Sequence, residues 1–308
     1  GLIYFDRKKN TFKQYLHNPN NENNLSSNVI VSLCIDSENI LWIGTYTGGL
    51  NSFDGKKFTH YRHDDADSGS LANDNVWKIF EDRKRNLWIG TLGAGLDVLD
   101  RKTGRFYNYQ NKQATPDILP SNFISDILQD KKGNLWFGTD NGIVVLNENN
   151  NQHVFYQHSN DINSLSNNNV LCISEDSKGR IWVGTREGMD LFNEQTKNFQ
   201  IFTMSDGLPD NLILNILEDE NQSLWISTPN GLCNAIPLQK EKGIALSVIN
   251  YSELNNLQNQ EFNNKAAYKT REGELIFGGP SGFNIINPSE IKKPVYHTKI
   301  VFTDLEIL

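Results

Sequence analysis

Three histidines occupy the same short phrase and are the first residues in this sequence to suggest chemistry. His17, His63 and His158 each follow a tyrosine by two positions, in YLH, YRH and YQH. Three imidazoles that converge could bind a metal ion such as zinc. If the phrase belongs to a repeat, however, the three side chains stand around a ring and need not meet. We therefore expect each histidine to anchor its own loop by a hydrogen bond, and we predict no metal site.

Two arginines, a tyrosine, a histidine and a glutamate are candidates for ligand binding. Arginine could bind a carboxylate or a sulfate through paired hydrogen bonds, and tyrosine could stack on a sugar ring. All five lie in turns or polar loops that we expect around a channel mouth on one face, where binding residues commonly gather. The predicted contacts are Tyr46, Arg62, His63, Arg186 and Glu187. The alternative for each is an ordinary solvated side chain.

These candidates are distributed over a repeat that is marked by tryptophan. The phrase LWIGT occurs at residues 41–45 and 87–91. It returns as LWFGT, IWVGT, LWIST and LIFGG at residues 135–139, 181–185, 224–228 and 275–279. The intervals between the tryptophan positions are 46, 48, 46, 43 and 51 residues. A period in the forties with several short strands per unit is typical of a β-propeller.

Each unit contains four strand patterns. The first places apolar residues three apart before an aspartate, as in Val76, Ile79 and Asp82, and is apolar enough to be buried on both faces. A tight turn follows, then the tryptophan phrase, then a third strand that starts at a Gly-Leu step, then an aromatic outer strand. We expect the tryptophan to fill the space between neighbouring blades. The glycine two residues later leaves room for the next blade to approach.

The two ends of the chain depart from the repeat. Residues 1–17 match only the third and fourth strands, and residues 294–308 form one long strand pattern. We predict an all-β propeller of four-stranded antiparallel blades over residues 1–293, with a leading half-blade at 1–17 followed by six repeats. This gives seven blade positions with the first blade incomplete. Six blades with a spare hairpin is the alternative.

Composition excludes several classes of function. The 308 residues carry a formal net charge of −8, and lysines and arginines are scattered among acidic residues, so we expect neither a nucleic-acid partner nor direct membrane contact. No apolar run approaches the roughly 18 residues of a membrane span. Cys34, Cys172 and Cys233 lack the spacing of a metal site, and we expect buried free thiols.

An enzymatic function finds little support. The segment 174–182, SEDSKGRIW, is somewhat similar to a sialidase Asp-box, but its turn is one residue longer. Sialidases also require clustered arginines at the channel mouth, whereas most arginines here fall in turns that we place on the opposite face. No Ser–His–Asp order stands out. We predict a chain with no catalytic residues and no cofactor.

The phrases at 41–54, 87–100, 135–147 and 181–193 resemble the two-component regulator propeller repeats of hybrid two-component sensors. The atypical last unit, residues 260–288, is similar to the closing blade of such a propeller. Residues 294–308 resemble the lead into an immunoglobulin-like (Y_Y_Y) domain.

The resemblance implies a periplasmic sensing module of an inner-membrane kinase, which binds an oligosaccharide from glycan breakdown without turnover. It also implies other domains of the same sensor as partners, and a homodimer of the full-length protein. A scaffold for protein partners is the alternative, and a glycosidase or polysaccharide lyase is a further one.

Overall fold

The computed structural model describes residues 1–110, 119–147, 152–241, 243–252 and 257–291. Nearly all regular structure in these ranges is β-strand, joined by one short 3-10 helix, η1 (Met204–Asp206). Within the same ranges, no helix has the length and apolar character needed to cross a membrane.

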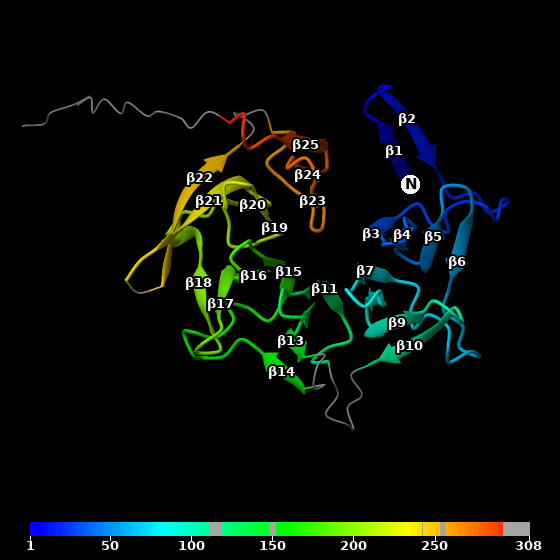
Figure 1. Ribbon diagram of the computed structural model, residues 1–308, viewed down its shortest axis with the longest axis horizontal. Helices are drawn as coiled ribbons and strands as arrows, with labels where there is room; N and C mark the ends of the chain where they lie inside the picture. The colour runs from blue at the N-terminus through cyan, green and yellow to red at the C-terminus, as the bar shows by residue number, and fades with distance from the viewer. Residues whose placement is uncertain (111–118, 148–151, 242, 253–256, 292–308) are drawn as a thin grey trace, which may run out of the picture.

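Antiparallel sheets radiate from a central axis as the blades of a propeller (Figure 1). We number the blades in chain order, and within each blade the strands run from the axis outward. Blades 1 and 2 consist of β3 (Ile30–Ile35), β4 (Leu41–Thr45), β5 (Leu50–Phe53) and β6 (Phe58–Tyr61), and of β7 (Val76–Glu81), β8 (Leu87–Thr91), β9 (Leu96–Asp100) and β10 (Arg105–Tyr109). Blades 3 and 4 consist of β11 (Ile124–Gln129), β12 (Asn134–Thr139), β13 (Gly142–Asn147) and β14 (Gln152–Tyr156), and of β15 (Val170–Glu175), β16 (Ile181–Thr185), β17 (Met189–Asn193) and β18 (Asn198–Phe202). Blades 5 and 6 consist of β19 (Asn215–Glu218), β20 (Leu224–Thr228), β21 (Gly231–Gln239) and β22 (Ile244–Tyr251), and of β23 (Ala267–Lys269), β24 (Leu275–Gly279) and β25 (Gly282–Ile286).

This architecture confirms the predicted all-β propeller of four-stranded antiparallel blades. Blade 6 has three described strands, and the fourth strand expected of its repeat is not among the described residues. The strand predicted for 294–308 also falls outside the described residues, so the division at residues 293 and 294 stays a prediction.

The repeated tryptophans fill the interfaces between blades, as predicted. Trp42, Trp88, Trp136, Trp182 and Trp225 are 0 to 7 % exposed. Trp42 packs toward blade 2, where Leu87 and Ile89 meet it from the other side. In four of these five phrases, all but LWIST at 224–228, a glycine two residues after the tryptophan permits this approach. A Cβ on Gly90 would lie 2.7 Å from the Cγ2 atom of Ile124 in blade 3.

An aspartate six residues before each tryptophan fixes the indole and the turn together. In blade 3, Asp130 accepts hydrogen bonds from the backbone amides of Lys132 and Asn134 and from the indole nitrogen of Trp136, the last at 2.9 Å. The other four indoles donate in the same way, at 2.7 to 2.9 Å, to Asp36, Asp82, Asp176 and Asp219. The bond from each tryptophan to this aspartate was not predicted from the sequence.

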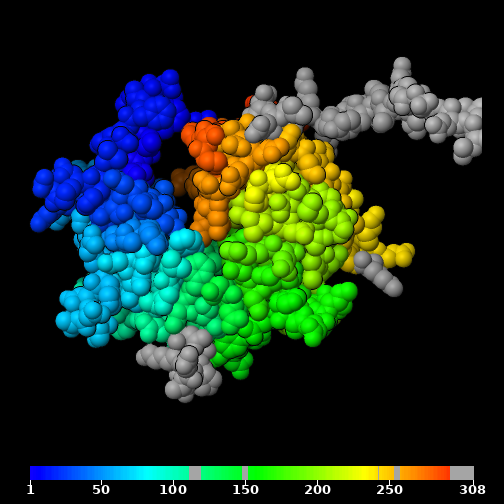
Figure 2. Space-filling view, turned by 180° about the vertical axis from the view of Figure 1, so that it is seen from behind, coloured from blue at the N-terminus to red at the C-terminus, as the bar shows by residue number. Residues whose placement is uncertain are grey.

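The leading hairpin, β1 (Leu2–Asp6) and β2 (Thr11–Tyr15), stands between blades 1 and 6. Its Leu2 and Tyr15 pack against the apolar cluster of blade 1, and its Arg7 pairs with Glu274 of blade 6 at 2.5 Å. Figure 2 shows the hairpin, in dark blue, as a projection beside the orange blade 6. The hairpin therefore occupies the place of the outer half of a further blade.

The inner half of that place is open in the structure. Leu33 of β3 is 51 % exposed, although the equivalent residues of blades 2 to 5 are only 3 to 7 % exposed: Ile79, Ile127, Ile173 and Ile216. Each of those isoleucines packs against the inner strands of the preceding blade, and Leu33 has no such strands before it among the described residues. We call this region the seam.

The cysteines follow the expectation with one exception. Cys172 and Cys233 are buried free thiols, whereas Cys34 is a half-buried free thiol at the edge of the apolar cluster between blades 1 and 2. Burial raises the pKa of all three thiols.

Candidate functional site

The three repeated histidines anchor loops, as predicted. In each, the ring Nδ1 donates to a backbone carbonyl at 2.7 or 2.8 Å, and the acceptors for His17, His63 and His158 are Leu25, Leu71 and Leu165. Their backbone amides bond the recurring side chain at the end of the same loop, which is Asn28, Asp74 and Asn168. Each histidine ring thus forms its hydrogen bond within its own loop, and the three rings do not form a common site.

The five predicted contact residues fall into two separate groups. Tyr46 and Arg62 lie where the β4–β5 turn meets the loop 62–75, and the Arg62 guanidinium is 3.8 Å from the Asp74 carboxylate. His63 belongs to the same loop. Its pKa is raised, first by the hydrogen bond to the Leu71 carbonyl and then by Asp65, whose carboxylate is 2.9 Å from Nε2.

Arg186 and Glu187 are exposed in the β16–β17 turn of blade 4, on the other side of the ring from blade 1 (Figure 1). The structure brings Tyr46, Arg62 and His63 into one neighbourhood and leaves Arg186 and Glu187 in another.

The long loops do not surround the channel mouth, and this corrects the expectation. The loop 62–75 runs along the outer edge of blade 2, where the Gly69 carbonyl accepts from the Phe106 amide at 2.8 Å and Asp67 pairs with Arg105 at 2.6 Å. The loop 157–169 makes the same backbone contact, from Phe199 to Asn163. An outermost strand has unpaired backbone groups, and each loop covers part of that edge.

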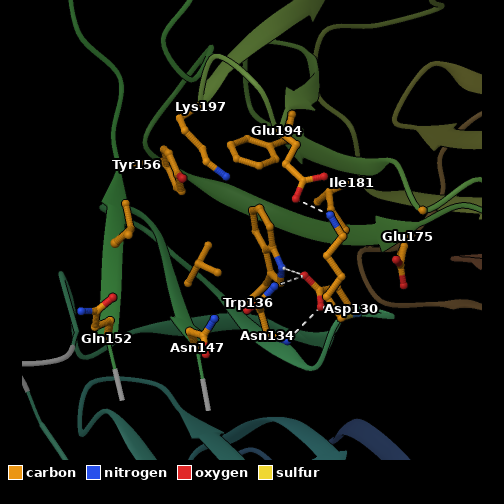
Figure 3. Close-up of a pocket in the computed structure, with 15 residues that line it drawn as sticks. Asp130, Asn134, Trp136, Asn147, Gln152, Tyr156, Glu175, Ile181, Glu194 and Lys197 are labelled. Carbon is orange, nitrogen blue, oxygen red and sulfur yellow. Dashed lines mark hydrogen bonds and ion pairs between the residues drawn. The ribbon is translucent and has the colours of Figure 1, made fainter. Parts of the chain in front are cut away.

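A groove between blades 3 and 4 combines aromatic and charged side chains on the face that carries the β11–β12 and β13–β14 turns (Figure 3). We call it the 3–4 groove, and its cavity measures about 480 Å³. Tyr156 stands over Trp136 with nearly parallel rings, at 6.4 Å between centroids, and Phe192 from blade 4 meets both rings edge-on. Burial raises the pKa of the Tyr156 hydroxyl. The rim is polar: Asn147, Gln152, Glu175, Glu194, Lys132 and Lys197.

The charged rim of the 3–4 groove is internally paired. The Lys132 ammonium forms an ion pair with Glu194 across the groove. The Glu175 carboxylate accepts from the backbone amide of Lys131 at 2.9 Å. The Lys197 ammonium lies 5.7 Å from the centre of the Phe192 ring. The groove thus presents aromatic surface beside carboxylate, ammonium and amide groups.

The equivalent groove between blades 1 and 2 shows what one residue changes. There Arg101 bridges the carboxylates of Asp36 and Glu81, at 2.7 Å each, and lies over Trp42. The cavity that remains measures about 300 Å³. In the 3–4 groove the repeat position of Arg101 is held by Glu194, which cannot bridge Asp130 and Glu175. A reversal of charge therefore leaves this groove wider than its counterpart.

The sequence contains the signal for this groove, but it is indirect. Arg101 and Glu194 each directly follow the last residue of the third strand of their blade. Both side chains face the tryptophan of the preceding blade. The signal becomes readable only when adjacent repeats are compared across an interface.

The fold and its grooves define a β-propeller whose blades share one sequence repeat. A model of the two-component regulator propeller family matches residues 24–47, 70–93, 118–141, 164–187 and 207–230. The chain carries repeats of the two-component regulator propeller family. Each match ends in the turn between the second and third strands, so it covers the inner half of a blade.

Among curated proteins, the chain is similar to histidine kinase P4 of Formosa agariphila, with 30 % identity over 102 residues. The similarity spans 33 % of this chain and 7 % of that protein.

Among solved structures, the chain is similar to two extracellular domains from B. thetaiotaomicron that are assigned to hybrid two-component systems. The first has a TM-score of 0.61 at 24 % identity and the second a TM-score of 0.52 at 21 % identity. They align with 87 % and 94 % of this chain, which spans 40 % and 44 % of theirs. Virginiamycin B lyase of Staphylococcus aureus has a TM-score of 0.58 at 14 % identity, over 91 % of this chain and 89 % of that one. At these identities the likeness is one of fold.

Proposed function

We propose that the chain is the extracytoplasmic sensing propeller of a hybrid two-component sensor kinase. In this proposal it lies on the periplasmic side of the inner membrane and binds an oligosaccharide from glycan breakdown without turning it over. Binding is passed to a kinase elsewhere in the longer protein. The family of the repeats, the histidine kinase relative and the two extracellular domains of like fold support this assignment.

The observation that carries the ligand class is the 3–4 groove. Sugars present apolar C–H faces and hydroxyl edges, so they suit aromatic rings beside carboxylates and amides. Tyr156 and Phe192 provide half-buried rings, and Glu175 and Glu194 provide acceptors at the rim. The proposal therefore places the oligosaccharide in the 3–4 groove. Two further contact regions remain proposed: one with Tyr46, Arg62 and His63, and the other with Arg186 and Glu187 in the β16–β17 turn.

Partners other than the sugar are also part of the proposal. We include other domains of the same sensor and a second copy of the full-length protein. A scaffold for a protein partner is a second candidate function. It is favoured by the exposed apolar side chains of the leading hairpin, Ile3, Tyr4 and Phe12.

Calorimetry against oligosaccharide digests tests the function and its site together. The informative variant is Glu194→Arg, because it installs the side chain that closes the groove between blades 1 and 2. We expect it to weaken oligosaccharide binding about tenfold or more, equal to a loss of about 1.4 kcal/mol. Glu194→Gln is the matched control, since it removes the ion pair with Lys132 without supplying a bridge.

Three outcomes would change the conclusion. If Arg62→Ala with Arg186→Ala abolishes binding and Glu194→Arg does not, the site moves to the loop surface while the function stands. If chromatography of the mixture shows shortened or unsaturated sugar, the chain is a hydrolase or a lyase. If no oligosaccharide binds, the ligand class proposed here is wrong.

A further inference from the structure

The innermost strands of the six blades enclose a channel along the propeller axis. In Figure 1 the strands β3, β7, β11, β15, β19 and β23 surround this axis. Side chains from all six line a cavity of about 400 Å³. It shares the residue Glu175 with the 3–4 groove, but that groove opens between the outer parts of two blades, whereas the channel opens at their inner ends.

One repeat position supplies most of the polar groups of the channel. It is the residue directly before the central apolar residue of each inner strand, and it is Ser32, Lys78, Asp126, Cys172 and Asn215 in blades 1 to 5. The Asp126 carboxylate accepts from the Ile173 amide of blade 4 at 2.8 Å, and it pairs with the Lys78 ammonium at 2.5 Å. Blade 3 thus contributes one carboxylate, which is already engaged on both sides.

A second lysine enters the channel from blade 6. The Lys265 ammonium donates to the Trp77 carbonyl of blade 2 at 2.8 Å and lies 4.9 Å from the centre of the Trp77 indole. Among the described residues, no carboxylate lies within 4.0 Å of it. Asp126 thus balances Lys78, and Lys265, when it is protonated, adds a positive charge without a carboxylate partner of its own among the described residues.

The other titratable residues that line the channel do not offset this charge. The Glu175 carboxylate keeps its charge but is turned toward the Lys131 amide of blade 3, at 2.9 and 3.1 Å, and the charges that act on Lys265 are those of Asp126 and Lys78. The thiol of Cys172 stays protonated because burial raises its pKa. Tyr268 is largely exposed to solvent.

Unpartnered polar atoms are found beside the three charged residues. Among the described residues, three of the buried side-chain atoms that lack a hydrogen-bond partner are Trp77 Nε1, Ser125 Oγ and Asn264 Oδ1. Each belongs to the chain neighbour of Lys78, Asp126 or Lys265. None of these three residues lines the channel cavity, and Asn264 Oδ1 can only accept a hydrogen bond, so they are not counted among the contacts of an anion.

We propose that the axial channel binds a small anion of the carboxylate or sulfate class between the ammonium groups of Lys265 and Lys78. Such an anion neutralises the surplus charge and accepts hydrogen bonds from both lysines. It would be either a free ion or the acidic group of a sugar acid. The proposal does not depend on the 3–4 groove.

Protonation of Lys265 couples this site to pH. Burial is the main cause of the lowered pKa of Lys265, and the nearby Lys78 lowers it further, while Asp126 acts against both. A bound anion favours the charged form and raises the pKa again. Binding should therefore take up a proton and weaken as the pH rises.

Calorimetry with sodium sulfate and with a hexuronic acid as separate probes tests the proposal. Experiments at about pH 6 and about pH 8, each in two buffers of different ionisation enthalpy, report the proton uptake. We expect a Kd on the order of 1 mM for a site of two ionic contacts. Lys265→Met should weaken binding about tenfold, and Lys265→Arg should restore it while abolishing the proton uptake, because arginine remains charged.

The outcomes distinguish a free ion from a sugar acid as the source of the anion, and a second variant keeps the test valid if the first one does not fold. Binding of sulfate alone supports a free-ion site, and binding of both probes supports an acidic sugar. Lys8→Met, at an exposed lysine of the β1–β2 turn that lines neither the channel nor the 3–4 groove, should leave the binding of both probes unchanged. If neither probe binds at about ten times the expected Kd, the proposal is overturned. Should Lys265→Met fail to fold, equal binding by the wild-type and Lys78→Met proteins would also overturn it.

Discussion

At the residue scale, the aspartate of each repeat links the turn, the tryptophan and the blade interface. Asp130 illustrates this, because its two oxygens accept four hydrogen bonds, from the amides of Lys132 and Asn134, the side chain of Asn134 and the indole of Trp136. All of these donors would lose their partner together if the carboxylate were removed. An unsatisfied buried donor costs about 1–3 kcal/mol, so this single side chain matters more to stability than its size suggests.

We predict that Asp130→Ala lowers the free energy of unfolding by about 3 kcal/mol or more, since it strands the buried indole N–H and two turn amides. Denaturant unfolding measures the change. The matched control is Asp65→Ala, because Asp65 is a fully exposed loop residue whose recorded contact is with His63. Its effect should stay within about 0.5 kcal/mol. Equal losses in the two variants would contradict the role given to the repeated aspartate.

A second residue-scale prediction concerns Asp190, which is fully buried in β17. Burial raises its pKa to about 7, against an ordinary value of 3.8, although Ser166 donates to it through both its amide and its hydroxyl. The folded state therefore binds a proton more tightly than the unfolded state does. The free energy of unfolding should fall as the pH rises from about 4 to about 7 and then level off.

Asp190→Asn should remove this dependence. Blade 1 already carries an asparagine at the same repeat position, where Asn51 accepts from the Ser26 amide and donates to the Ser26 hydroxyl. At about pH 8 the variant should be more stable than the wild type by about 1–2 kcal/mol. The pKa difference between the folded and unfolded states sets an upper limit of about 4 kcal/mol on this gain. The gain should vanish near pH 4, where the carboxyl is protonated in both states. Unfolding curves measured across this range provide the test. A gain that is the same at every pH would show that titration of Asp190 is not its cause.

At the element scale, the strands were predictable and the paths of the loops were not. Tryptophans at a period in the forties predicted the second strand of each blade, and apolar residues three apart predicted the first. The loop 62–75 contains no such pattern. Its course along β10 is decided by the unpaired edge of that strand, which exists only after blade 2 has formed. The 3–4 groove was missed for the same reason, because the effect of Glu194 on its width depends on Asp130 and Glu175, which only the fold brings next to it.

The loop anchors offer a prediction at this scale. His63→Ala removes the hydrogen bond from Nδ1 to the Leu71 carbonyl, which ties one end of the loop 62–75 to the other. A lost bond of this kind costs about 1 kcal/mol, so local opening of the loop should become about fivefold more frequent. Limited proteolysis measures the cleavage rate within 62–75. His153→Ala is the control, because His153 lies on the outer strand β14 and its ring contacts Phe155. Similar cleavage rates in the two variants would mean that the anchor does not hold the loop.

At the scale of the whole molecule, the propeller has one interface unlike the others. Blades 1 to 5 meet their neighbours through buried apolar clusters, whereas blades 1 and 6 are separated at their inner ends by the seam. Within the described part of the chain, the side-chain contacts that reach around or across the seam are the ion pair of Arg7 with Glu274 and the hydrogen bond from Lys265 to the Trp77 carbonyl. Both are polar and depend on few atoms, so the ring should be weakest here.

Leu33 and Ile127 provide a matched test of the seam, because they hold the same repeat position in blades 1 and 3. Ile127 is 3 % exposed and packs with Trp88 and Leu135, so Ile127→Ala should cost about 3 kcal/mol through lost burial and a cavity. Leu33 is 51 % exposed, so Leu33→Ala should cost no more than about 1 kcal/mol. Denaturant unfolding at several protein concentrations measures both. Equal costs would mean that Leu33 is covered in solution. If that equality appeared only at high protein concentration, a second copy of the chain would be the cover. If it held at every concentration, the inner strands of the ring would be closed in a way that the structure does not show.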